Sequence, residues 1–366
     1  MKKRERTIIP SRFNPMKKTI AVLPGDGVGP EVTEEAKQIL NAIAEKFGHA
    51  FTFQEGLIGA VAIDKIGNPY PDETHTLCIN SDAILFGAIG DPKYDNDPQA
   101  KIRPEQGLLK MRKVLGLYAN VRPIFIFKNL LNASPLKEEI IKGTDFIVIR
   151  ELIGGIYFGK RGRDKTHTSA FDTSEYSKKE IERVAKYAFQ LAQKRKKKLT
   201  VVDKANVLET SRLWRETIQD MEKNFADVTV NYMFVDNASM QIIKRPSVFD
   251  VIVTENMFGD ILTDEASVIT GSLGMLPSAS IGEKTAIYEP IHGSYPKAAG
   301  QNTANPIGAI LSAAMMLEYS FGLKNESDTV YKAVKKVLNQ GFGTKDLSPK
   351  KILGTKELGK KISALI

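Results

Sequence analysis

Residues 249–280 read FDVIVTENMFGDILTDEASVITGSLGMLPSAS, and this stretch decides how the fold is interpreted. The run at 251–253 is apolar and β-branched, and polar residues follow it, which is typical of a buried strand that enters a loop. From Phe258 onward the apolar residues recur at helical spacing. The sequence therefore predicts a strand, a loop and a helix in that order, a unit that α/β proteins repeat.

Two aspartates near the start of this helix are candidate metal ligands. Asp260 and Asp264 are four residues apart, which places both carboxylates on one helical face. Like charges so placed repel, and a hard divalent cation held by carboxylate oxygens would relieve the repulsion. The alternative is that both aspartates suit the positive end of the helix dipole. Their spacing alone leaves both interpretations open.

The composition defines the class of protein. The chain has 366 residues, of which 42% are hydrophobic and 26% charged, so it can bury a large core and is long enough for two domains of one enzyme-sized unit. This composition excludes a disordered or fibrous protein. The formal net charge of +9 is consistent either with binding to nucleic acid or with a site that binds small polyanions.

One dense basic run, KRKKK at 194–198, follows a helix-like segment. Cations are favoured at a helix C-terminus, so a solvated helix end explains the run. The hypothesis from a different functional class is a nucleic-acid-binding module that uses this run, whose binding would depend steeply on salt.

The single cysteine, Cys78, excludes an internal disulfide and indicates a reducing compartment. No apolar segment reaches the roughly 18 residues of a membrane span, and the N-terminus lacks the apolar core of a secretory signal. We therefore expect a cytoplasmic protein with no membrane partner. Residues 1–15 are basic and precede Met16, which fits a short disordered extension, a mis-assigned start or a weak organellar presequence.

Two glycine-containing loops follow predicted strands. Residues 24–31, PGDGVGPE, lie between a strand at 19–23 and a helix at 31–47, and the glycines permit close approach of the backbone. The spacing differs from the G-x-G-x-x-G dinucleotide fingerprint. A second apolar run, 82–89, leads into a turn-rich loop at 90–94. Ligands of α/β proteins bind at such strand-to-loop junctions.

Three arginines are candidates for carboxylate recognition. On a helix, Leu108, Leu109 and Arg112 share one side, so an apolar surface and a guanidinium can face the same ligand. Arg122 follows at a strand, and Arg150 ends another. Arginine suits bidentate carboxylate binding, and three that converge fit a di- or tricarboxylate. Taken singly, each is more typical of a surface or salt-bridged arginine.

Three further residues stand where chemistry is common. Tyr157 lies among glycines, Lys204 ends an apolar strand, and Asp236 ends a strand predicted at 228–235. A lysine in such a place is either paired structurally or has a depressed pKa and handles protons. The stretch at 288–306 shows no periodicity, and long loops inside compact domains are usually functional.

Six motifs in order resemble those of the β-decarboxylating dehydrogenases, the isocitrate/isopropylmalate dehydrogenase family. They are LPGDGVGPEV (23–32), IRPEQGLLKMRK (102–113) with YANVRP (118–123), RELIGGIYFG (150–159), VDKANVLE (202–209), FGDILTDEAS (258–267) with GSLGMLPSAS (271–280), and EPIHGS (289–294) followed by ANP (304–306). The resemblance runs from about Thr19 to past Glu318, which is essentially the whole chain.

The resemblance implies an α/β fold unlike the classical Rossmann fold, with two α/β domains that share a large mixed sheet of ten strands. Residues 1–117 and 271–366 would form the first, cofactor-side domain. Residues 118–270 would form the second domain, which carries the dimerisation surface and the metal site. The family is homodimeric with shared active sites.

The resemblance also implies the reaction. We expect oxidative decarboxylation of 3-isopropylmalate to 4-methyl-2-oxopentanoate with reduction of NAD, in leucine biosynthesis. Leu108, Leu109 and Val207 would form a pocket for the isopropyl group, where isocitrate dehydrogenases place polar residues. The alternatives are homoisocitrate, isocitrate or a tartrate- or malate-type substrate. No nucleic-acid partner is expected.

Residue roles follow from the matched motifs. Arg112, Arg122 and Arg150 would hold the malate carboxylates. Asp260 and Asp264 would bind Mg²⁺ or Mn²⁺ together with Asp236, which also contacts the substrate. Lys204 would take the hydroxyl proton at C2, and Tyr157 would supply a proton to C3. Lys204 and Asp236 would come from the partner subunit.

The cofactor site implied by the resemblance centres on the loop after EPIHGS. Its members are Glu105, His292, Gly293, Ser294, Tyr295, Pro296, Lys297, Ala298, Ala299, Gly300 and Asn305. NAD-using relatives commonly carry an acidic residue where this chain has Lys297, and NADP-using isocitrate dehydrogenases have lysine followed by tyrosine. Because Ala298 follows here, only half of a 2′-phosphate site is present, and we expect NAD with weak discrimination against NADP.

Overall fold

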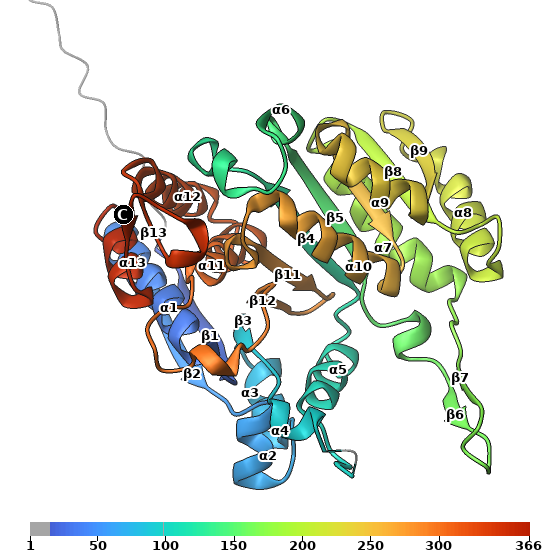
Figure 1. The fold of residues 1–366 in the computed structure, drawn as a ribbon, viewed down its shortest axis with the longest axis horizontal. Coiled ribbons are helices and arrows are strands. Elements are labelled where there is room, and N and C mark those ends of the chain that lie inside the picture. The colour runs from blue at the N-terminus through green and yellow to red at the C-terminus, as the bar shows by residue number, and fades with distance from the viewer. Residues whose placement is uncertain (1–14, 98) are drawn as a thin grey trace, which may run out of the picture.

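The computed structural model describes residues 15–97 and 99–366, and at its centre lies one mixed sheet (Figure 1). Within the described residues, this sheet has ten strands in the order β2-β1-β3-β12-β11-β4-β5-β10-β8-β9. The strands are β1 (Lys17–Gly25), β2 (Ala50–Glu55), β3 (Ala83–Ala88), β4 (Ala119–Phe125), β5 (Asp145–Glu151), β8 (Lys198–Asp203), β9 (Thr229–Phe234), β10 (Val251–Thr254), β11 (Pro277–Ile281) and β12 (Ala286–Pro290). The predicted ten-stranded sheet is confirmed.

The sheet combines two patterns of pairing. β11 runs antiparallel to both β12 and β4, and β4 runs antiparallel to β5. The outer strands pair in parallel, for example β1 with β3 and β10 with β8. β3, AILFGA, is buried along its whole length, as expected of a strand covered on both faces.

Helices cover both faces of the sheet, and shorter elements connect them (Figure 1). The α-helices are α1 (Gly29–Phe47), α2 (Ala60–Ile66), α3 (Asp72–Ile79), α4 (Pro92–Asp95), α5 (Pro104–Val114), α6 (Glu138–Ile141), α7 (Lys178–Gln193), α8 (Glu209–Glu222), α9 (Val235–Lys244), α10 (Asn256–Ser267), α11 (Ile307–Tyr319), α12 (Lys324–Asn339) and α13 (Thr355–Ser363). Two-stranded sheets join β6 (Arg161–Arg163) to β7 (Ala170–Asp172) and β13 (Phe342–Gly343) to β14 (Lys351–Ile352).

The main hydrophobic core is continuous across the sheet. It joins residues of α1, β1, α7, β8, α11 and α12. α11 is its centre, because residues 307–317 are all buried. Smaller clusters lie around Phe146 and Leu262, and around Phe86 and Met111. These clusters support the strand ends that carry the predicted site.

Three local predictions were wrong. The stretch at 288–306 is not loop throughout, because Ala286–Pro290 forms the buried strand β12 between β3 and β11. Pro92–Asp95 in the predicted loop at 90–94 forms the short helix α4, capped by the Asp91 side chain. Asp236 lies in the first turn of α9 instead of at the end of a strand.

The basic run at 194–198 is partly neutralised. Arg195 contacts the carboxylates of Asp145 and Asp250 at 2.8 Å each, and Lys197 pairs with Asp227 at 3.1 Å. Backbone amides of the run also donate to Asp250. These contacts close the turn between α7 and β8. In the described part of the chain, no helix has the length and apolarity to cross a bilayer.

Candidate active site

Three buried arginines converge where α5, β4, β5 and α10 meet. Arg112 lies in the last turn of α5, Arg122 in β4 and Arg150 in β5, and their side chains are at most 11% exposed. The strands β4 and β5 are neighbours, which brings two of the arginines together. A buried guanidinium is costly unless it is paired and hydrogen-bonded, so the partners of each arginine define the site.

Arg122 and Arg150 both donate to neighbouring side chains. Arg122 donates from Nε to Asn120 Oδ1 at 2.6 Å and from Nη1 to Thr263 Oγ1 at 2.5 Å. Arg150 donates from Nε and Nη2 to Asn256 Oδ1 at 3.0 and 2.8 Å. Burial and the charge of Arg122 lower the pKa of Arg150 to about 10, so the two cations lie close enough to repel.

Arg112 has a free donor. Its Nη2 donates to Glu289 Oε1 at 3.1 Å, but its Nε is buried and has no hydrogen-bond partner among the described residues. A buried donor without a partner is uncommon and costs about 1–3 kcal/mol. A ligand carboxylate would satisfy this N–H.

The two predicted metal ligands face these arginines. Asp260 accepts a hydrogen bond from Arg150, and its Oδ1 is 3.8 Å from Nη2 of Arg122. Asp264 Oδ1 is 3.5 Å from Nη1 of Arg122. Desolvation by the surrounding protein and the charge of Asp260 raise the pKa of Asp264. The predicted repulsion between the two carboxylates is therefore present, and arginines offset it.

Tyr157 reaches the same carboxylate from η2 (Gly155–Tyr157). Its hydroxyl donates to Asp260 Oδ2 at 3.0 Å. Burial and the charge of Asp260 raise the pKa of Tyr157. The phenol therefore stays protonated at neutral pH, as a proton donor must.

The cluster is neutral as a whole. Three guanidiniums, Arg112, Arg122 and Arg150, face three carboxylates, those of Glu289, Asp260 and Asp264. A dicarboxylate together with a divalent cation is also neutral, so the cluster can take up both without an uncompensated buried charge.

Lys204 and Asp236 form a separate pair. Lys204 follows β8, and its Nζ lies 3.0 Å from Asp236 Oδ1. The Asp236 side chain is 63% exposed, and the hydrogen bond from Lys204 lowers its pKa. Across residues 15–97 and 99–366 of one chain, no three acidic, histidine or cysteine side chains lie close enough to hold a metal ion. Asp236 thus does not join Asp260 and Asp264 within one chain.

The three residues of the predicted apolar pocket differ in exposure. Leu108 and Leu109 are half-buried on α5. Val207 is 60% exposed, and its amide donates to the carbonyl of Lys204. Val207 therefore lies in the turn that follows Lys204, with more than half of its side chain open to solvent.

The predicted cofactor loop is held mainly through its backbone. Val28 N donates to Ser294 O at 2.7 Å, which joins the loop to the glycine-rich turn after β1. A Cβ atom added at Gly90 would lie 3.0 Å from Glu105 Oε1 and 3.5 Å from Ser294 Oγ. The structure thus brings Glu105 together with the loop.

Several features of this loop fit a bound dinucleotide. Burial lowers the pKa of His292, and its Nε2 has no hydrogen-bond partner among the described residues. Added Cβ atoms at Gly293 and Gly300 would meet nothing within 4 Å. Tyr295 is 64% exposed, and its backbone has a left-handed conformation with a φ of 39°. The other predicted members follow: Pro296, Lys297 and Ala298 form η6, Ala299 and Gly300 are exposed, and Asn305 Nδ2 donates to Asp346 at 3.0 Å.

Sequence reasoning missed four positioning side chains. Asn256 accepts two of the hydrogen bonds from Arg150 and donates from Nδ2 to Gly154 O at 3.0 Å. Asp26 accepts from the amides of Ala60, Val61 and Gly90 at 2.9 Å each. Glu31 accepts from the amides of Gly300 at 2.5 Å and Asn302 at 3.1 Å. Asn120 orients Arg122. Asp26, Glu31 and Asn120 lie inside quoted motifs, and Asn256 lies two residues before one, which was their only signal.

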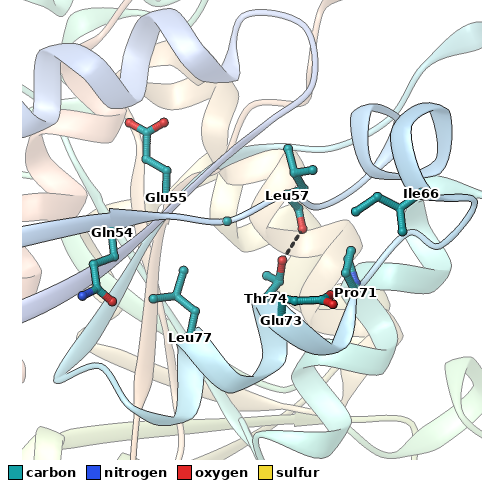
Figure 2. Close-up of a pocket in the computed structure, with 9 residues that line it drawn as sticks. Gln54, Glu55, Leu57, Ile66, Pro71, Glu73, Thr74 and Leu77 are labelled. Carbon is teal, nitrogen blue, oxygen red and sulfur yellow. Dashed lines mark hydrogen bonds between the residues drawn. The ribbon is translucent and has the colours of Figure 1, made fainter.

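A small pocket of about 360 Å³ lies elsewhere, beside β2 and α3 (Figure 2). The hydroxyl of Thr74 donates to Leu57 O across it at 2.7 Å. Its lining includes Leu57, Ile66 and Leu77 and none of the predicted site residues. The pocket therefore plays no part in the arrangement described above.

The fold and the arginine–aspartate cluster define a class of protein. The model of the family described as isocitrate/isopropylmalate dehydrogenase matches residues 19–362, and the chain belongs to this family. Curated relatives are named 3-isopropylmalate dehydrogenase. That of Bacteroides fragilis strain YCH46 is 54% identical over 342 residues, which is 93% of this chain and 96% of the relative. That of Geobacillus kaustophilus strain HTA426 is 56% identical over 353 residues, 95% of each chain.

Solved structures agree with the fold. Isocitrate dehydrogenase from Methylococcus capsulatus has a TM-score of 0.86 at 31% identity, over 95% of this chain and 99% of that chain. A β-decarboxylating dehydrogenase from Thermococcus kodakarensis in its apo form has a TM-score of 0.79 at 33% identity.

Proposed function

We propose that the chain oxidises and decarboxylates 3-isopropylmalate to 4-methyl-2-oxopentanoate in leucine biosynthesis, with NAD as the acceptor. The observation that carries this proposal lies on α5, where Leu108 and Leu109 precede Arg112 and its unpartnered, buried Nε. One helix thus offers the same ligand an apolar surface and an N–H group that can donate to a carboxylate. The identity of 54–56% to the named relatives supports the same substrate.

The leucines decide between the candidate substrates. Isocitrate and homoisocitrate carry a third carboxylate, which would lie against Leu108 and Leu109 without a partner. Burying an unpaired carboxylate costs several kcal/mol, whereas one methylene more or less changes binding by about 1–3 kcal/mol. Discrimination against tricarboxylates is therefore strong, and discrimination among alkylmalates is weak.

The chain has side chains suited to a divalent metal ion and to NAD. Asp260 and Asp264, with Asp236 of the partner subunit, would hold Mg²⁺ or Mn²⁺, because carboxylate oxygens suit hard cations. Such an ion supplies Lewis-acid polarisation of the oxygen on C2. The 292–305 loop and Glu105 would hold NAD, which supplies the hydride acceptor.

The chain's own residues handle the protons and the charge. Arg112, Arg122 and Arg150 orient the two carboxylates of the malate. Lys204 of the partner subunit takes the proton from the C2 hydroxyl during oxidation. After CO₂ leaves C3, Tyr157 gives its proton to that carbon, and its raised pKa keeps the proton available.

A homodimer with shared active sites completes this proposal. Asp236, which pairs with Lys204, does not form a metal-binding group with Asp260 and Asp264 among the described residues of one chain, and Val207 is 60% exposed. Exposed hydrophobic side chains gather in the same part of the chain, among them Met240 on α9 and Ile261 on α10. A second chain that covers them would bring the Lys204 pair to the cluster.

The proposed domains follow the sheet order. The strands β2, β1, β3, β12 and β11 come from residues 1–117 and 271–366, and the other five come from residues 118–270. This grouping supports two domains with those bounds. We retain a cytoplasmic location as part of the proposal.

A turnover assay tests the proposed function. 3-Isopropylmalate, isocitrate, homoisocitrate and tartrate are each supplied with NAD and with NADP, in the presence of Mg²⁺. We expect the highest kcat/KM with 3-isopropylmalate and NAD. A higher value with a tricarboxylate would contradict the role given to the two leucines.

A further inference from the structure

A buried polar chain connects Arg122 with Arg112 across the sheet. Arg122 Nε donates to Asn120 Oδ1 at 2.6 Å, and Asn120 Nδ2 donates to Ser280 Oγ at 3.1 Å. Ser280 Oγ lies 3.4 Å from Glu289 Oε1, which accepts from Arg112 at 3.1 Å. Asn120 and Ser280 are completely buried. They are directly opposed on β4 and β11, so the chain runs across the strand pair.

The direction of these hydrogen bonds is fixed by chemistry. A guanidinium can only donate, so the Asn120 oxygen must face Arg122 and its amide nitrogen must face Ser280. Ser280 then accepts from Asn120, and its own hydrogen can only go to Glu289, a carboxylate that accepts. The polar chain therefore has a donor at each end, Arg122 and Arg112, and one anion between them, the carboxylate of Glu289.

We infer that Asn120 and Ser280 are positioning residues that set the distance and orientation between Arg112 and Arg122. The inference rests on the proposed function, in which these two arginines hold the two carboxylates of a malate. Arg112 comes from α5 and Arg122 from β4. The polar chain of hydrogen bonds joins them through Ser280 on β11 and Glu289 on β12. A single orientation of Asn120 satisfies every member, so the arginines are held in place before substrate binds.

A purely structural role predicts a different result. Removing a buried hydroxyl destabilises the fold wherever it lies, whereas a positioning role changes substrate affinity as well. Ser278 is a matched control. It lies two residues before Ser280 on β11 and is also buried, but it donates to the backbone oxygen of Glu289 at 3.1 Å and not to the carboxylate that belongs to the polar chain.

The experiment compares Ser280→Ala, Ser280→Thr and Ser278→Ala in the full-length protein. The Kd for 3-isopropylmalate is measured by calorimetry with Mg²⁺, and KM, kcat and Tm are measured in parallel. We expect Ser280→Ala to raise Kd and KM about fivefold or more, with a smaller change in kcat and none in the KM for NAD. Ser280→Thr keeps the hydroxyl and should restore Kd to within about threefold. Ser278→Ala should lower Tm without raising Kd.

Two results would overturn the inference: an unchanged Kd in a folded Ser280→Ala protein, or an equal rise in Kd for Ser278→Ala. If Ser280→Ala does not fold, Asn120→Asp replaces it, since the acid keeps the acceptor for Arg122 but loses the donor to Ser280. Its Kd should also rise, and an unchanged value counts against the inference. A wild-type protein that neither binds nor oxidises 3-isopropylmalate would refute the proposed function, which is a separate outcome.

Discussion

The arginine–aspartate cluster and the cofactor loop are built in opposite ways. In the cluster, side chains hold one another, as when Asn256 takes two hydrogen bonds from Arg150. In the loop, backbone groups carry the contacts, as when Glu31 accepts from the amides of Gly300 and Asn302. A change in the cluster therefore disturbs several neighbours, whereas exposed loop side chains such as Lys297 can change alone. In the proposed function, a network of side chains would hold the substrate, whereas single positions of the loop would decide the cofactor.

The largest expected effect concerns the proton carriers. Lys204→Met should reduce oxidation by about 10² to 10⁴-fold, because a general base contributes that much. Tyr157→Phe should impair the later proton transfer more than hydride transfer. Single-turnover NADH formation, measured beside release of the decarboxylated product, separates the steps. Equal loss of oxidation in both variants, with a supplied β-keto acid still processed normally by Tyr157→Phe, would contradict these roles.

Mixing the two inactive variants tests whether Lys204 and Tyr157 of one active site come from different subunits. An equal mixture of Lys204→Met and Tyr157→Phe subunits gives half mixed dimers, each with one intact site. Activity should therefore recover to about a quarter of the wild-type value. Subunit exchange is verified by native mass spectrometry. No recovery after proven exchange would place both groups in one chain.

Asp260→Asn tests the centre of the network. Asp260 contacts Arg150 and Tyr157, so the change removes a proposed metal ligand and the counter-charge of an arginine together. kcat/KM should fall about 100-fold, and saturation should need more Mg²⁺ or Mn²⁺. Metal titrations of both proteins provide the measurement. Wild-type activity that persists in excess EDTA would remove the metal from the proposal.

Glu31→Gln tests how the loop is held. The amide keeps one acceptor but loses the charge that binds two backbone N–H groups. The KM for NAD should rise about three- to tenfold, because charge-assisted hydrogen bonds are about twice as strong as neutral ones. The KM for 3-isopropylmalate should stay constant. A matching rise in both values would show that loop and cluster are coupled.

The smallest expected effect belongs to Lys297. One exposed cation contributes up to about 1 kcal/mol toward a phosphate, so Lys297→Asp should increase the preference for NAD over NADP by about fivefold. The ratio of kcat/KM values for the two cofactors gives the answer. A wild-type preference for NADP would mean that Lys297 outweighs the rest of the loop.

Local pattern was enough for much of the fold. The strands β1 and β3 contain continuous apolar runs, and α10 has helical apolar spacing, so each was predicted near its observed bounds. β12 was missed because AIYEP has no pattern of its own and is a strand only between β3 and β11. Sheet order of this kind is set by tertiary contacts.

The site shows the same limit. The motifs identified Arg122, Arg150 and Asp260, but their partners were out of reach of sequence spacing. Thr263 meets Arg122 across 141 residues, and Asn256 meets Arg150 across 106. Val207 is 60% exposed, and its place in the predicted pocket with Leu108 and Leu109 stays a prediction.

The sheet order also governs when the fold can form during synthesis. β3 pairs with β12, and β4 pairs with β11. One edge of β3 and one edge of β4 therefore stay unpaired until strands that lie about 150 residues beyond β4 have been synthesised. At about 5–20 residues per second, a ribosome needs roughly 8–30 s to supply them. An apolar edge such as that of β3 is a template for wrong pairing during this interval. The nascent chain is therefore expected to require chaperone protection until residue 290 has left the exit tunnel.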